Sequence, residues 1–141
     1  MWLQKEIILK SRNKGFHLIT DEVLSNLPEL KNIKIGLVNL LLKHTSASLT
    51  LNENADPDVR SDMKKYFDEL VPENKKYFDH TLEGADDMPA HIKTSLLGNS
   101  ITIPITNGRL NLGIWQGIYL CEHRNYESAR KLIITINGES Q

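Results

Sequence analysis

The residues best suited to chemistry lie in one short polar stretch, HTLEGADDMPAHIK, which runs from His80 to Lys93. It places two histidines, several carboxylates and a glycine around a predicted helix start at Pro89. Neutral imidazole is the commonest metal ligand in proteins, and the positive end of a helix dipole disfavours protonation of an imidazole in the first turn. We therefore expect His91 to bind a metal, with His80 reaching the same point across the loop.

His44 is the third expected ligand. It follows the apolar run IKIGLVNLLL, which predicts a strand, so its ring should lie at a strand end. Three ring nitrogens converging from separate segments are typical of a zinc site that keeps one open position. The simpler interpretation is structural: Asp86 or Asp87 only caps a helix, and the hydroxyls of HTSAS bond their own backbone.

The same region also suits a phosphorylated ligand. The predicted helix start offers free N–H groups, hydroxyls follow His44, and Arg109 carries a positive charge. Because a divalent ion often neutralises a phosphoryl group, zinc or magnesium is compatible with this interpretation. We assign metal ligation to His44, His80 and His91; catalysis to Glu53, Asp87, Arg109 and Glu122; and substrate or phosphate binding to Thr45, Ser46, Ser48, Asn54 and Gln116.

Three helices are predicted from apolar spacing and from start and stop residues. The first covers residues 21–27 and ends before Pro28. The second begins at Asp56-Pro57 and carries apolar residues at helical spacing up to Leu70. The third covers residues 87–97, ends at Gly98, and is expected to bury Leu96.

Alternating and apolar runs predict strands over residues 2–10, 33–42, 48–53 and 131–137. Residues 100–123 are expected to form a hairpin, because Asn107-Gly108 is typical of a type I′ turn. No alternation of strand, helix and strand occurs. The sequence therefore predicts a single α+β domain over residues 1–141, with a mainly antiparallel or mixed sheet and two to three helices.

Composition excludes several classes of function. A chain of 141 residues that is 40% hydrophobic and 25% charged fits one globular domain, and its net charge of -1 offers no field for nucleic acid or an anionic membrane. No apolar stretch reaches the length of a membrane span or a signal peptide, which predicts a cytoplasmic protein. Nucleotide-binding glycine loops, HExxH and CxxC are all absent. Cys121, the single cysteine, lies in an apolar run typical of a buried residue.

Three longer motifs give the chain a specific resemblance to the YjbQ family of small bacterial and archaeal proteins. They are HTSASLTLNEN (44–54), EGADDMPAHIK (83–93) and SxxIxIxxGxxxxGxWQxI (100–118). The resemblance implies an α+β fold, a homotrimer and a secondary thiamine-phosphate synthase activity. An exposed apolar stretch with Trp115, Ile118 and Tyr119 is the expected subunit contact.

The expected function is that of a metal-dependent enzyme acting on phosphorylated small molecules. The reaction that the resemblance implies joins a pyrimidine pyrophosphate to a thiazole phosphate and releases pyrophosphate, which a metal and cationic groups would stabilise. The alternative is a metal- or small-ligand-binding protein without turnover. A purely structural or partner-binding role is the third interpretation.

Overall fold

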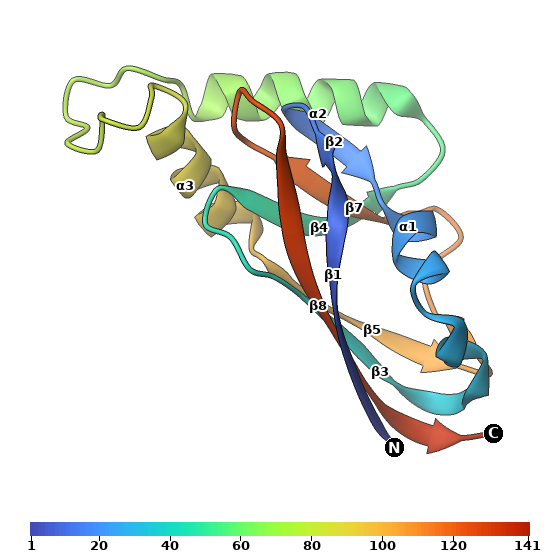
Figure 1. Ribbon diagram of the computed structural model, residues 1–141. Helices are drawn as coiled ribbons and strands as arrows, with labels where there is room; N and C mark the ends of the chain where they lie inside the picture. Colours follow the sequence, from blue (N-terminus) through green and yellow to red (C-terminus); the bar gives the residue numbers. More distant parts are fainter.

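Two antiparallel sheets and the helices that flank them make up the fold in the computed structural model, which describes all residues from Met1 to Gln141 (Figure 1). The larger sheet has the strand order β1-β8-β3-β5-β6, and the smaller has the order β2-β7-β4. The strands are β1 (Trp2–Arg12), β2 (Gly15–Leu18), β3 (Ile33–Leu42), β4 (Ala47–Glu53), β5 (Ser100–Thr106), β6 (Arg109–Leu110), β7 (Gln116–Glu122) and β8 (Ser128–Ser140).

The helices are α1 (Thr20–Ser25), a 3-10 helix (Pro28–Asn32), α2 (Pro57–Leu70) and α3 (Asp87–Leu97). The start of α2 and the end of α3 lie where the local signals predict, whereas α1 ends at Ser25, two residues before its predicted end. The Asp56 side chain accepts a hydrogen bond from the Asp58 amide at 2.9 Å, and Pro57 follows it at the first helical position. None of the helices is both long and apolar enough to cross a membrane.

The main core lies between the two sheets, and a second apolar cluster lies between the smaller sheet and α2. Alternate residues of β7 serve both: Ile118 and Leu120 belong to the main core, whereas Tyr119 and Cys121 join Phe16 in the second cluster. This arrangement explains why residues 118–121 of β7 are apolar without interruption, since both faces of the strand are covered. The α+β architecture predicted from the sequence is confirmed.

Two expectations about exposure are wrong. Ile118 and Tyr119 are fully buried, so they offer no surface to a partner, while Trp115 is exposed. Leu96 is 60% exposed because the buried face of α3 is formed instead by Ala90 and its neighbours.

The predicted hairpin over residues 100–123 is only partly correct. Asn107 and Gly108 have φ angles of 49° and 79°, as a type I′ turn requires, but the returning strand β6 ends at Leu110. The chain then crosses to the smaller sheet, where β7 pairs with β2 and β4.

Candidate metal centre

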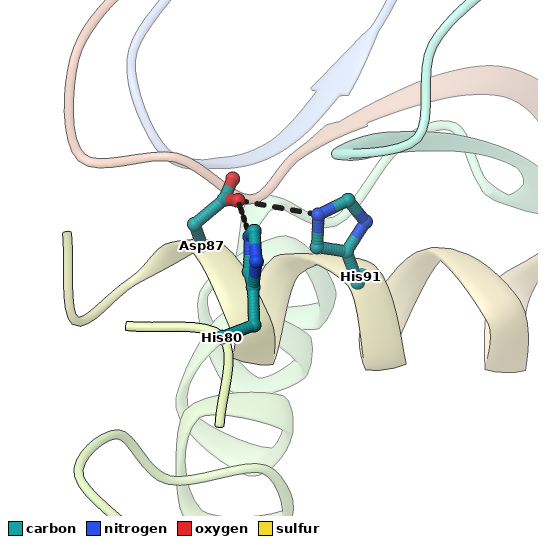
Figure 2. Close-up of side chains that lie close together, drawn as sticks. All are labelled: His80, Asp87 and His91. Carbon is teal, nitrogen blue, oxygen red and sulfur yellow. Dashed lines mark hydrogen bonds and ion pairs between the residues drawn. The ribbon is translucent and has the colours of Figure 1, made fainter. Parts of the chain in front are cut away.

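Three side chains from the predicted polar stretch converge at the start of α3 (Figure 2). Oδ2 of Asp87 lies 2.6 Å from Nε2 of His80 and 3.2 Å from Nε2 of His91. Asp87 and His91 are four residues apart on α3 and therefore share one face of the helix. His80 comes from the connection between α2 and α3, and its ring centroid lies 5.2 Å from that of His91.

Arg124 binds the Asp87 carboxylate through the oxygen that the two histidines do not contact. Its Nη1 donates to Oδ1 of Asp87 at 2.6 Å, its Nε donates to Oδ2 of Asp86 at 2.8 Å, and its Nη2 donates to the Glu83 carbonyl at 2.9 Å. The guanidinium also lies 4.7 Å from the centroid of the Tyr126 ring. Arg124 thus fixes one oxygen of Asp87 and leaves the other to the two histidines.

The loop before α3 is built to bring these groups together. Gly84 has a φ of +112°, and a Cβ at this position would lie 2.9 Å from Oδ1 of Asp86, so glycine is required for both reasons. The Asp86 side chain makes no capping bond to α3 and instead accepts from Arg124 and from the Asn125 amide. The interpretation of Asp86 as an ordinary helix cap is therefore wrong.

Electrostatics keep the Asp87 carboxylate ionised although the residue is buried. Burial alone would raise the pKa of Asp87, but hydrogen bonding to His80 and the charge of Arg124 outweigh it and hold the pKa below its ordinary value. The pKa of Arg124 is raised above its ordinary value, since bonds to Asp86 outweigh the opposing effect of burial. The site therefore presents a fixed negative charge beside two imidazoles.

Two imidazole nitrogens and one carboxylate oxygen form a donor set that suits zinc better than magnesium, which prefers oxygen ligands alone. The three ligand atoms all lie within 4.8 Å of one another. Around a zinc ion with bonds of about 2.0 Å, neighbouring ligand atoms are roughly 3.3 Å apart, so small side-chain rotations suffice. Three protein ligands also leave a fourth position for water or substrate.

His44 is not part of this cluster, which corrects the expectation that three rings meet. Its Nε2 accepts a hydrogen bond of 2.8 Å from the Lys131 amide, so β8 holds the ring beside the end of β3. Burial, followed by the charge of Arg130, lowers the pKa of His44. Thr45, the next residue, lines a cavity together with His91.

Glu122 and two of the serines form a separate buried network. Arg130 donates from Nε to Oε2 of Glu122 at 2.8 Å, makes a second bond to Oε1, and reaches the Ser46 hydroxyl at 3.1 Å. The Ser48 hydroxyl lies 2.8 Å from Nε2 of His123. Glu122 and Ser48 are therefore occupied within the fold rather than directed at the three-residue cluster.

The remaining predicted residues lie far from the cluster. The start of β4 lies beside α3, because the Thr94 hydroxyl donates to the Ala47 carbonyl. Glu53 is at the other end of this strand, about 20 Å from Ala47 at roughly 3.3 Å per residue. Arg109 is exposed near the turn at the end of β5. Asn54 and Gln116 adjoin Glu53 and bond neighbouring backbone groups.

Sequence reasoning missed the ion pairs that place α3. The side chain of Lys93 is buried, and its Nζ lies 2.7 Å from Oδ1 of Asp68 on α2. Lys14 and Lys64 contact the same carboxylate at 3.1 and 3.0 Å. Burial lowers the pKa of Lys93, against the opposing effect of Asp68. The i,i+4 spacing of Lys64 and Asp68 was the only local signal, since the other two partners are distant in sequence.

The buried His123 should make the protein less stable in mild acid. Burial, aided by the charges of Lys93 and Arg130, lowers the pKa of His123 from 6.5 to about 3. Between these values the unfolded chain binds a proton that the folded chain does not, so stability falls as pH decreases from 6.5 towards 3. The expected slope is up to about 1.4 kcal/mol per pH unit.

Urea unfolding of the wild type and His123→Gln at pH 7, 6 and 5 measures this slope. The variant should lose the part of the pH dependence that comes from His123, because glutamine does not titrate, and should keep the part that comes from the lowered pKa of His44. Equal slopes in the two proteins would assign the acid sensitivity to other groups.

Comparison with known proteins agrees with the fold. The family model described as UPF0047 protein YjbQ-like matches residues 5–139. The UPF0047 protein YjbQ of Escherichia coli O157:H7 is 53% identical over 139 residues, which cover 99% of this chain and 100% of the relative. The protein of the same name from Salmonella typhimurium is 55% identical, with the same coverage.

Solved structures of related proteins have the same fold. A conserved protein of the yjbq/upf0047 family from Clostridium acetobutylicum is 39% identical, has a TM-score of 0.82, and aligns over 94% of this chain and 99% of its own. A protein from Thermus thermophilus is 32% identical, with a TM-score of 0.80 and coverage of 92% and 97%. The family match extends over nearly the whole chain, and the YjbQ relatives align over their full length. The chain belongs to the UPF0047 YjbQ-like family.

Proposed function

We propose that this chain is a metal-dependent enzyme acting on phosphorylated small molecules, with a reaction like that of thiamine-phosphate synthase. The observation that carries the proposal is the convergence of His80, Asp87 and His91, whose ligand atoms lie within 4.8 Å of one another. A bound divalent ion would supply positive charge to a phosphoryl or pyrophosphate leaving group. The thiamine-phosphate synthase reaction rests on the family resemblance described above.

The chain's own residues support binding of such a group. Arg124 keeps Asp87 oriented through Oδ1, so that Oδ2 faces the histidines. His80 and His91 are 41% and 34% exposed, which leaves them accessible from solvent. Thr45 and His91 line one cavity, so a hydroxyl predicted to bind substrate lies beside a proposed ligand.

Binding without turnover is the second candidate, because the other predicted catalytic residues do not gather at the cluster. Glu53 lies at the far end of β4, Arg109 lies near the β5 turn, and Glu122 is bound to Arg130. The cluster alone supplies ligands for an ion but no separate acid or base held beside it. A storage or sensing role needs only the ligands.

Metal analysis and a paired assay separate these functions. Protein purified without an affinity tag should contain close to one zinc per chain by inductively coupled plasma analysis, and a chelator should remove it. A pyrimidine pyrophosphate and a thiazole phosphate should then yield thiamine phosphate and pyrophosphate only with the metal-loaded protein. Metal without product favours the binding role, and absence of metal contradicts both.

We also propose that the chain forms a cyclic homotrimer through the outer face of the larger sheet. No helix covers this face (Figure 1), and the strand register places several exposed apolar side chains on it, opposite polar residues such as Lys131 and Asn137 as well as Ile133. The exposed apolar side chains include Ile8, Ile35, Leu37 and Leu41.

Sedimentation at micromolar concentration should give a species of three times the 16.1 kDa chain mass. Leu37→Glu should shift it to the single-chain mass, because a charge in a packed interface is costly. The matched substitution Leu96→Glu, on exposed α3, should leave the trimer intact. A 16.1 kDa wild-type species would contradict the proposal.

A further inference from the structure

A polar cavity of about 340 Å³ adjoins the metal centre and shares His91 with it. Small-ligand sites generally begin at roughly 300 Å³, so the space is sufficient for a small molecule. Its lining contains no hydrophobic residue and, apart from His91, no ionisable side chain. The lining residues are Thr45, His91, Thr94, Ser95, Gly98 and Asn99.

The walls of this cavity are fixed by the fold. The Asn99 carbonyl accepts from the Leu42 amide at 2.8 Å, and the Gly98 carbonyl accepts from the Leu49 amide at 3.0 Å. The Thr94 hydroxyl donates to the Ala47 carbonyl at 3.3 Å. These bonds join the end of α3 to β3 and β4, so the cavity exists before any ligand arrives.

Several polar groups in the lining remain available to a ligand. The hydroxyls of Thr45 and Ser95 belong to exposed side chains, and Thr94 retains a lone pair after donating its own proton. His91 connects the cavity to the cluster: Nε2 faces Asp87, and the other ring nitrogen lies on the far side of the ring (Figure 2).

The direction of the α3 dipole determines whether the charged part of a ligand is favoured at the metal centre or in the cavity. The metal cluster lies at the N-terminal end of α3, which is the positive end of its dipole, whereas Ser95, Gly98 and Asn99 lie at the C-terminal, negative end. No lysine or arginine lines the cavity to offset that negative end. An anionic group is therefore favoured at the metal and disfavoured in the cavity.

We infer that this cavity binds the uncharged, hydroxyl-bearing part of a phosphorylated small molecule whose phosphate lies at the metal centre. This inference rests on the metal site of the proposed function and not on the synthase reaction, because the pyrimidine and thiazole substrates keep no free hydroxyl once they are phosphorylated. Thr45 and Ser95 are the residues that distinguish a hydroxylated ligand from an apolar one.

Calorimetric titration of the zinc-loaded protein with glycerol 1-phosphate and methyl phosphate tests the inference, because the two probes share a phosphate monoester and differ in hydroxyls. Glycerol 1-phosphate should bind about tenfold more tightly, as expected for one or two neutral hydrogen bonds. Thr45→Val/Ser95→Ala should abolish this difference by weakening glycerol 1-phosphate binding to the level of methyl phosphate binding. Leu96→Gln, exposed on the same helix but outside the cavity, is the matched control and should preserve the difference.

The outcomes are distinct. Equal binding of the two probes by zinc-loaded wild type, or a difference that persists in the double variant, overturns the inference and leaves the metal site intact. A wild-type chain that binds no zinc overturns the proposed metal site and the ligand orientation together.

Discussion

His91→Ala is expected to weaken zinc binding by more than about a hundredfold while leaving the fold intact. Loss of an outer-shell partner of a metal alone costs about 10- to 100-fold in affinity, and His91 would contact the ion directly. Its side chain is one-third exposed and contributes to neither apolar cluster, so the free energy of unfolding should change by less than about 1 kcal/mol. Equilibrium zinc titration and circular dichroism measure the two effects separately.

His17→Ala provides the matched control, because His17 also carries a hydrogen-bonded ring but lies outside the cluster. It should retain wild-type zinc affinity. If His91→Ala keeps its zinc and any synthase activity but unfolds at lower temperature, His91 is a structural residue. The zinc would then be bound at a site other than the proposed cluster at the start of α3.

Glu122→Gln should destabilise the folded chain by about 3–5 kcal/mol, because it leaves the buried Arg130 guanidinium without its negative partner. The carboxylate also accepts from the His123 amide at 3.1 Å, and glutamine reproduces that contact but not the charge. Urea unfolding at pH 7 gives the change directly, at a pH where the effect of His123 is small.

The double variant Glu122→Leu/Arg130→Met removes both charges and should recover much of that loss, since a buried pair is often no more stabilising than apolar residues of similar volume. This comparison also tests the predicted catalytic role of Glu122. A Glu122→Gln protein that is fully stable but inactive would favour catalysis over a structural ion pair.

Local signals account for the parts of the fold that were predicted well. Asp56-Pro57 and Gly98 mark helix ends through their own backbone preferences, and Asn107-Gly108 specifies a turn without help from the rest of the chain. Which strands pair with each other is not determined by the residues of one strand alone. The alternation of residues 110–114 predicts a strand that returns beside β5, but β7 pairs with β2 and β4 in the other sheet. An apolar pattern shows that a strand is buried and does not specify the strand with which it pairs.

In the candidate site, too, the residues close in sequence were predictable and the distant ones were not. Asp87 and His91 are brought together by helical spacing, and His80 is close to them in sequence, so this part was predictable. Arg124 was missed because it reaches Asp86 and Asp87 from the connection between β7 and β8, a relation that no spacing reveals. His44 was misplaced for the opposite reason, since a strand end fixes its position but not the direction of its ring.

The origin of the three proposed ligands has a consequence for the rate of metal exchange. Asp87 and His91 are carried by one rigid helix, whereas His80 comes from the connection before it. Release of an ion therefore requires only that this connection lift away from α3, and local opening costs less free energy than global unfolding. Chelators should remove the ion at a rate set by this loop, well before the sheets unfold. Movement of His80 would therefore set the rate of metal exchange, while Asp87 and His91 keep their positions on α3.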